Sequence, residues 1–118
     1  MAEKRRLDRL AEQLRIELGA LIGGELDDPR VRMVTVTQVH LSKDMRHARV
    51  RVSALGSKVD RQRSLDGLNS ARNFLRRQLS HRLPRLKRTP ELTFDYDESV
   101  ENETRIEELL SQIHTDEQ

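Results

Sequence analysis

The sequence contains no cysteine, and only 3% of its residues are aromatic. Without cysteine, the chain has no disulfide framework, no thiol nucleophile and no cysteine-ligated zinc site. The longest uncharged stretch, Met33 to Ser42, is far too short to span a membrane. The N-terminus alternates charged residues with leucine and has no apolar run of the kind found in secretory signals. We therefore expect a cytoplasmic protein with no membrane partner.

The residues that are present suffice for one small core. The chain has 118 residues, of which 31 are Leu, Ile, Val or Phe. This is about a quarter of the chain, whereas disordered sequences usually have less than about 20% of these four residues. The length fits one domain. We expect a single domain over residues 1–118, ordered from about residue 5 to residue 113 and followed by a short polar tail.

Apolar periodicity gives the order of the elements. Leucines at steps of three and four predict a first helix over residues 3–23, ending at Gly23-Gly24. The Val- and Thr-rich stretch from Met33 to Ser42 favours a strand. Residues 47–54 alternate strictly between apolar and polar, which is typical of a half-buried strand, and the four-residue link between the two strands suits an antiparallel hairpin.

The second half of the chain repeats this alternation of helix and strand. Apolar residues from Leu65 to Leu83 predict a second helix that ends before Pro84. A third strand follows Pro90, with Leu92, Phe94 and Tyr96 on its inward face. Ser99 is expected to cap a last helix, whose apolar stripe is Ile106, Leu109, Leu110 and Ile113. The predicted fold class is α+β, with helices layered on a small sheet.

Charge is strongly segregated along the chain, although the net charge is only +2. Residues 1–29 have a net charge of −2, residues 30–88 of +13 and residues 89–118 of −9. The middle of the chain is therefore expected either to bind a polyanion or to fold against the chain's own acidic ends.

The densest basic stretch runs from residue 72 to residue 88 and contains no Asp or Glu. Arginine's planar guanidinium suits bidentate contacts with phosphate, so this stretch favours nucleic-acid binding over a solvated helix face balanced by the acidic C-terminal segment. Arg49 and Arg51 either add to RNA binding or serve as edge charges that discourage strand-to-strand aggregation. The candidate RNA-binding cations are Arg49, Arg51, Arg72, Arg76, Arg77, Arg82, Arg85, Lys87 and Arg88.

The scarcity of aromatic residues limits the mode of RNA binding. Recognition sheets that stack bases need exposed rings. Here the rings are Phe74, Phe94 and Tyr96, and the last two lie on the inward face of their strand. Contacts with the backbone and shape of structured RNA fit better.

Enzymatic functions have little support in the sequence. The four histidines are scattered without the spacing of metal ligands, and no glycine-rich phosphate loop follows a strand. We therefore expect no metal, no cofactor and no catalytic residue. His81 lies among arginines and is the one candidate general base for RNA cleavage, against its simpler role as a polar surface residue.

The chain resembles the bacterial ribosome-binding factor A family from about Arg5 to Ile113. The resemblance is carried by segments 28–30, 39–44 and 68–79, by Ala48, by the run from Pro90 to Ser99, and by Arg105-Ile106 and Leu109-Leu110. The resemblance implies a type II KH-like fold with a three-stranded sheet and a kinked helix. The family's Ala-x-Gly signature at the kink is matched by Ala71-Arg72-Asn73. The chain departs from it at Asn73, and asparagine tolerates a left-handed backbone better than other non-glycine residues.

The resemblance also implies a function without catalysis. Proteins of this family bind the free 30S small ribosomal subunit, assist late maturation of 16S rRNA, including its 5′ end, and matter most in the cold. The expected partners are therefore the free small subunit and 16S rRNA, bound by a monomer. By this reasoning Ala71, Arg72 and Asn73, together with the basic residues after them, contact rRNA phosphates.

Three other functions remain open from the residues. A helix-turn-helix-like DNA-binding protein could place the arginines after Asn73 in a major groove. A ribosome-associated ribonuclease would need His81. A protein-interaction module would use the basic and acidic segments to bind partner proteins.

Overall fold

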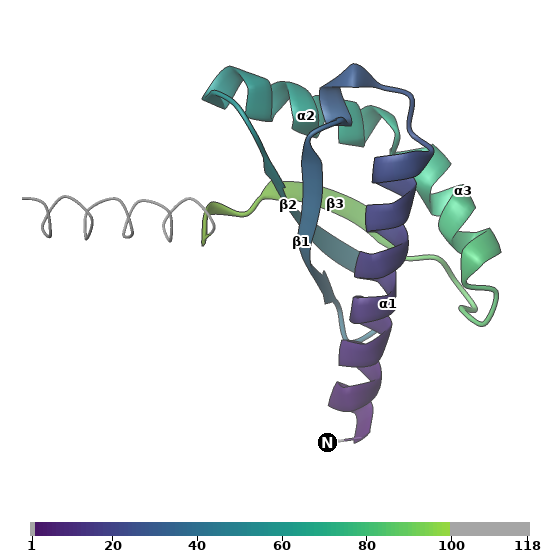
Figure 1. Cartoon of the computed structure of the whole chain (residues 1–118). Helices are drawn as coiled ribbons and strands as arrows, with labels where there is room; N and C mark the ends of the chain where they lie inside the picture. The colour runs from purple at the N-terminus through teal and green to yellow at the C-terminus, as the bar shows by residue number, and fades with distance from the viewer. Residues whose placement is uncertain (1, 100–118) are drawn as a thin grey trace, which may run out of the picture.

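The computed structural model describes residues 2–99 as a three-stranded sheet with helices packed against one face (Figure 1). Helix α1 (Ala2–Gly24) and the short 3-10 helix η1 (Pro29–Val31) precede strands β1 (Val34–Leu41) and β2 (His47–Ala54). Helices α2 (Lys58–Ser70) and α3 (Arg72–Arg82) follow, and β3 (Glu91–Tyr96) completes the sheet. The predicted α+β class is confirmed, and the first helix and first two strands end within one residue of their predicted bounds.

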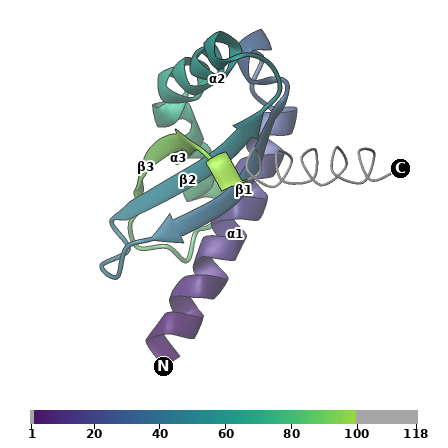
Figure 2. The same cartoon turned by 90° about the vertical axis from the view of Figure 1, so that its left-hand side faces the viewer.

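The strands lie in the order β1-β2-β3, with β1 antiparallel and β3 parallel to β2. Figure 2 shows β2 between its two neighbours. The interpretation of Arg49 and Arg51 as edge charges is therefore wrong, because both lie on the central strand. Arg49 instead reaches across the outer face to Asp95 of β3, with its Nε 2.6 Å from the carboxylate oxygen.

The core lies between the helices and the inner face of the sheet. A bulge between Val36 and Gln38 shifts the alternation of β1, which lets Val36 and Val39 both face inward although they are three residues apart. On β3, Leu92 and Phe94 are buried as predicted, whereas Tyr96 is only half-buried under the Arg61 guanidinium. The largest fully buried side chains are Leu14, Leu18, Leu21, Val31, Val50, Val52, Leu68, Leu75, Leu79 and Leu92.

The predicted helix over 65–83 is interrupted at Ala71. This residue has φ −89° and ψ 1°, which lies outside the helical region. Its N–H donates to the Gly67 and Leu68 carbonyls at 3.1 Å each, and its own carbonyl accepts the Leu75 N–H, so the backbone stays bonded through the break. The break needs no left-handed residue: within residues 2–99 the only non-glycine residue with positive φ is Met45. Asn73 therefore lies in ordinary helical backbone.

Close packing fixes the position of α2. A Cβ added at Gly67 would lie 3.0 Å from Val31 Cγ1, so glycine lets this helix approach η1. Ser64 donates its hydroxyl to the Arg30 carbonyl at 2.8 Å. The helix begins with a capping box, in which Ser57 and Asp60 satisfy each other's backbone N–H groups.

The cap after β3 differs from the prediction. The Asp97 carboxylate accepts hydrogen bonds from the Ser99 N–H at 3.0 Å and the Ser99 hydroxyl at 2.5 Å, so Asp97 is the capping residue rather than Ser99. Thr37 donates its hydroxyl to the other Asp97 oxygen at 2.6 Å. These bonds hold the pKa of this buried carboxyl below its usual range, with the Ser99 hydroxyl the largest cause. The stripe predicted for the last helix, residues 106–113, lies outside the described residues.

Within residues 2–99, no helix is long and apolar enough to cross a membrane.

Candidate nucleic-acid interface

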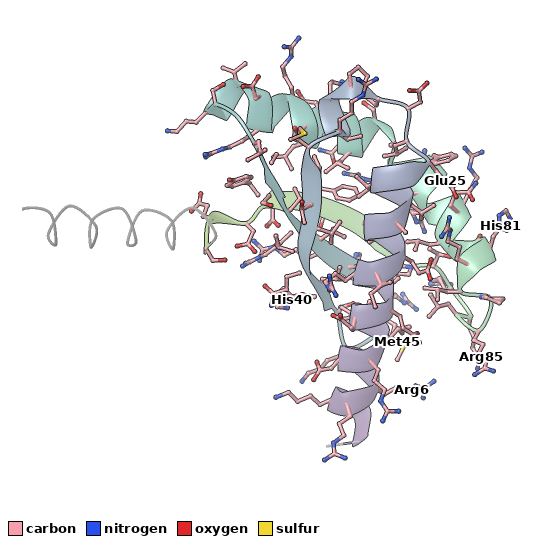
Figure 3. All side chains as sticks on the ribbon, viewed as in Figure 1. Arg6, Glu25, His40, Met45, His81 and Arg85 are labelled. Atoms are coloured by element: carbon pink, nitrogen blue, oxygen red, sulfur yellow. The ribbon has the colours of Figure 1, made fainter. Side chains whose placement is uncertain are left out.

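A large groove opens where three segments distant in sequence meet. Its walls are the N-terminal half of α1, the turn between β1 and β2, and the segment that follows α3, and its volume is about 1380 Å³. Figure 3 shows Arg6, Met45 and Arg85 on these three segments. We call this feature the basic groove, and it is lined by Arg5, Arg6, Arg9, Leu10, Gln13, Asp44, Met45, Arg46 and residues 82–88.

The strand turn is built by its own side chains. Asp44 accepts the Ser42 hydroxyl at 2.6 Å and the Arg46 N–H at 3.0 Å, and these bonds lower the pKa of its carboxyl, with the Ser42 hydroxyl the larger cause. The Met45 N–H donates to the Ser42 carbonyl at 2.9 Å, and Met45 takes a left-handed φ of 61°. This tight turn fixes Met45 and Arg46 in the lining of the groove.

Two arginines hold the third wall in place. Arg76 donates its Nε to the Pro90 carbonyl at 3.2 Å and an Nη to the Thr89 carbonyl at 3.1 Å. Arg82 forms ion pairs with Glu17, at 3.1 Å, and with Glu25, both on or next to α1. The two carboxylates raise the pKa of the Arg82 guanidinium, with Glu17 the larger cause. The segment between these anchors is thus tied at both ends.

The groove is strongly cationic. Eight of its fifteen lining residues are Arg or Lys, and Asp44 is the single carboxylate among them. No ion pair within residues 2–99 involves seven of these cations, all of which are exposed: Arg5, Arg6, Arg9, Arg46, Arg85, Lys87 and Arg88. A concave surface lined by charges of one sign concentrates the potential and attracts a polyanion.

Sequence reasoning missed half of these cations. Arg5, Arg6 and Arg9 lie in a segment with a net charge of −2, so a count by segment concealed them. Four of the seven acidic residues of that segment form ion pairs within the protein: Glu12 with Arg15, Asp28 with Arg30, and Glu17 and Glu25 with Arg82. The sequence did contain a signal for these three arginines, because their spacing places Arg5, Arg6 and Arg9 on one face of a helix. Arg46 carried no signal, since its position depends on the turn.

The predicted site residues separate into four places. Arg82, Arg85, Lys87 and Arg88 come together in the basic groove. Ala71, Arg72 and Asn73 lie at the joint between α2 and α3, where Arg72 donates to the Asn69 side chain at 2.6 Å. Arg77 is exposed on α3 outside the groove lining, and Arg76 is turned to the Thr89 and Pro90 carbonyls. Arg49 and Arg51 lie on the sheet, on the face away from the helices.

The histidines among residues 2–99 do not gather into a site. His40 extends from β1 and His81 from α3, on opposite sides of the molecule (Figure 3). In the part of the chain that the structure describes, no group of three or more His, Asp or Glu side chains could hold a metal ion.

Comparisons with known proteins agree with this architecture. The model of the ribosome-binding factor A family matches residues 6–110. The crystal structure of ribosome-binding factor A from Thermus thermophilus has 33% identity and a TM-score of 0.70, covering 76% of this chain and 93% of its own. A Thermotoga maritima protein studied by solution NMR has 36% identity and a TM-score of 0.66, covering 74% and 82%.

A third similar structure is a homology model of the Thermus thermophilus factor fitted into a cryo-EM map of its complex with 30S. It has 33% identity and a TM-score of 0.65, with 78% of this chain and 96% of that chain covered. The fold is accordingly the KH-like fold of these proteins, as the resemblance implied.

Proposed function

The chain belongs to the ribosome-binding factor A family, and from that premise we propose that it is a non-catalytic assembly factor for the small ribosomal subunit. It binds the free 30S particle and assists late maturation of 16S rRNA, including processing of the 5′ end. It acts in the cytoplasm as a single-domain monomer and supports growth in the cold. It needs no cofactor.

The observation that carries this proposal is the basic groove. Seven of its eight exposed cations form no ion pair within residues 2–99, and rRNA supplies the phosphates that such a surface attracts. A relative with 33% identity was fitted as part of a 30S complex, and it covers 78% of this chain. Both points favour the small subunit as the partner.

The competing functions fit the geometry less well. A helix-turn-helix protein needs a recognition helix that is free to enter a major groove. Here α3 directs Arg76 to the Thr89 and Pro90 carbonyls and Arg82 to α1, so the face that would read DNA is tied to its own domain. A ribonuclease would depend on His81, which lies exposed on α3 outside the groove lining.

The proposal is tested by sucrose-gradient sedimentation of lysate that contains the tagged protein, at low and moderate salt. We expect the protein in the free small-subunit fractions and not with large subunits or assembled ribosomes. Depletion of the protein should lengthen the 5′ end of 16S rRNA in primer extension, and more so in the cold. Protein that stays at the top of both gradients while small subunits are present would refute the assignment.

A further inference from the structure

We propose that the basic groove binds one strand of RNA by its phosphates, independently of base sequence, at a site separate from the joint around Ala71. The inference rests on the proposed function and adds to it the residues and the form of the ligand. The groove takes its cations from both ends of the described chain: Arg5, Arg6 and Arg9 from α1, and Arg85, Lys87 and Arg88 from the segment after α3.

The site is distant from the joint. Helix α3 has 11 residues and therefore spans about 16 Å. Ala71 immediately precedes the first residue of α3. Arg82 is the last residue of α3 and lines the groove. The joint and the groove thus lie at opposite ends of this helix. In Figure 1 the C-terminal end of α3 is the end nearer to the N-terminal part of α1. An RNA bound in the groove need not touch Asn73.

The shape of the groove favours one strand over a duplex. Helix, turn and connecting segment form three walls, and a concave site of this kind can enclose a single backbone. The volume of about 1380 Å³ exceeds the roughly 300–1,000 Å³ of sites for single small ligands, so a polymer segment fits better than a mononucleotide.

The chemistry of the lining indicates backbone contacts. Leu10, Met45, Leu83, Pro84 and Leu86 provide apolar surface between the cations, against which riboses and base faces can rest. None of the lining residues is aromatic, so the groove lacks the rings on which single-stranded binding proteins usually stack bases. Binding through phosphates alone carries no base preference.

The composition of the cations favours RNA over an acidic protein segment. Seven of the eight are arginine, whose planar fork makes paired hydrogen bonds to phosphate. The walls are fixed before binding, by the Ser42–Asp44 turn on one side and the Arg76 and Arg82 anchors on the other. Because these walls are already ordered, binding of RNA costs little conformational entropy of the protein.

The test compares two charge-reversal variants of the full chain. The groove variant carries Arg6→Glu, Arg9→Glu and Lys87→Glu, all at exposed positions without ion pairs in the described structure. The control variant carries Arg32→Glu, Lys58→Glu and Arg63→Glu, which are exposed, lie outside the groove and change the net charge equally. Circular dichroism and thermal unfolding verify that both variants fold.

Binding is measured by anisotropy with a labelled oligouridylate and an oligoadenylate, each about twelve nucleotides long, within the range that single-strand binding domains occupy. We expect the groove variant to bind both at least about tenfold more weakly than wild type. Its slope of log K against log salt should be shallower by about 2, because each phosphate contact contributes about 0.7. The control variant should bind within about threefold of wild type.

Equal losses in the two variants, or no loss in either, would overturn the inference. A groove variant that no longer binds a glutamate-rich peptide but still binds RNA would overturn it as well. The proposed function is judged separately by sedimentation with purified small subunits. If the wild-type protein fails to bind small subunits, the proposed function is refuted. If the wild-type protein and the groove variant bind them equally well, only the role of the groove is refuted.

Discussion

Substitution of Arg76 tests whether this arginine stabilises the fold around the groove rather than binding RNA. Its guanidinium donates to the Thr89 and Pro90 carbonyls at 3.1 and 3.2 Å, and these bonds tie α3 to the chain just before β3. Arg77, its neighbour, is exposed and makes no side-chain hydrogen bond or ion pair within the described residues. The two residues carry the same charge in different environments.

Arg76→Gln removes both bonds. Each hydrogen bond from a charged donor contributes about 1.5 kcal/mol when buried and less here, because the side chain is only half-buried. We therefore expect a loss of about 2 kcal/mol in the free energy of unfolding. This loss corresponds to a fall of about 8 °C in Tm for a domain of this size. Arg77→Gln should change the free energy by less than about 0.5 kcal/mol.

Urea denaturation gives both free energies, and hydrogen exchange reports on the segment itself. In Arg76→Gln, amides of residues 83–90 should exchange faster than in wild type, because one anchor of that segment is lost. An Arg76→Gln variant as stable as wild type, with unchanged exchange over these residues, would refute the anchoring role. Equal losses in the Arg76 and Arg77 variants would refute it as well.

Three further predictions concern the fold. Leu75→Ala should lower the free energy of unfolding by about 2–5 kcal/mol in urea denaturation, because the side chain is fully buried in the core; a loss below about 1 kcal/mol would contradict that burial. Hydrogen bonds from Ser99 and Thr37 keep the folded pKa of Asp97 below its unfolded value of about 3.9. The stability that ionised Asp97 contributes is therefore complete above about pH 4 and lost as the pH falls through the folded pKa. Asp97→Asn keeps an oxygen that can accept from Ser99 but replaces the oxygen that accepts the Thr37 hydroxyl by an amide donor. The advantage of wild type over this variant in denaturant titrations should be about 1 kcal/mol at neutral pH and shrink below about pH 4, and an advantage that grows in acid would contradict the assignment. Asn73→Gly should lower the free energy of unfolding by a few tenths of a kcal/mol, and Tm slightly with it, because Asn73 lies in helical backbone and glycine is the poorer helix former; a rise in Tm would indicate a left-handed residue there.

Local pattern predicted most of the elements, because each depends on residues close in sequence. The alternation over 47–54 gave β2 at its observed bounds, and the leucine stripe gave α1 within a residue at each end. The break at Ala71 escaped periodicity, since Leu68 and Leu75 keep helical spacing across it and both are buried. The family resemblance located that break, whereas the residues alone did not.

The site was less predictable because tertiary structure builds it. Arg5 and Lys87 are far apart in sequence, and only the packing of α1 beside α3 brings both to one groove. One of the two interpretations of Arg49 placed it at a sheet edge, but parallel pairing of β3 with β2 makes its strand central. Arg76 and Arg77 cannot be told apart by charge, and the direction in which each points decides its role.

The proposed contact between the basic groove and rRNA of the small subunit can be tested by photocrosslinking. Gln13 lines the groove, is exposed and carries no charge, so a photoreactive benzoylphenylalanine can replace it without removing a cation. Irradiation of this protein bound to purified free small subunits should crosslink it to 16S rRNA, whereas the same group at Arg63 on α2 should not. A Gln13 probe that crosslinks only to ribosomal proteins, while the protein is bound, would contradict the claim.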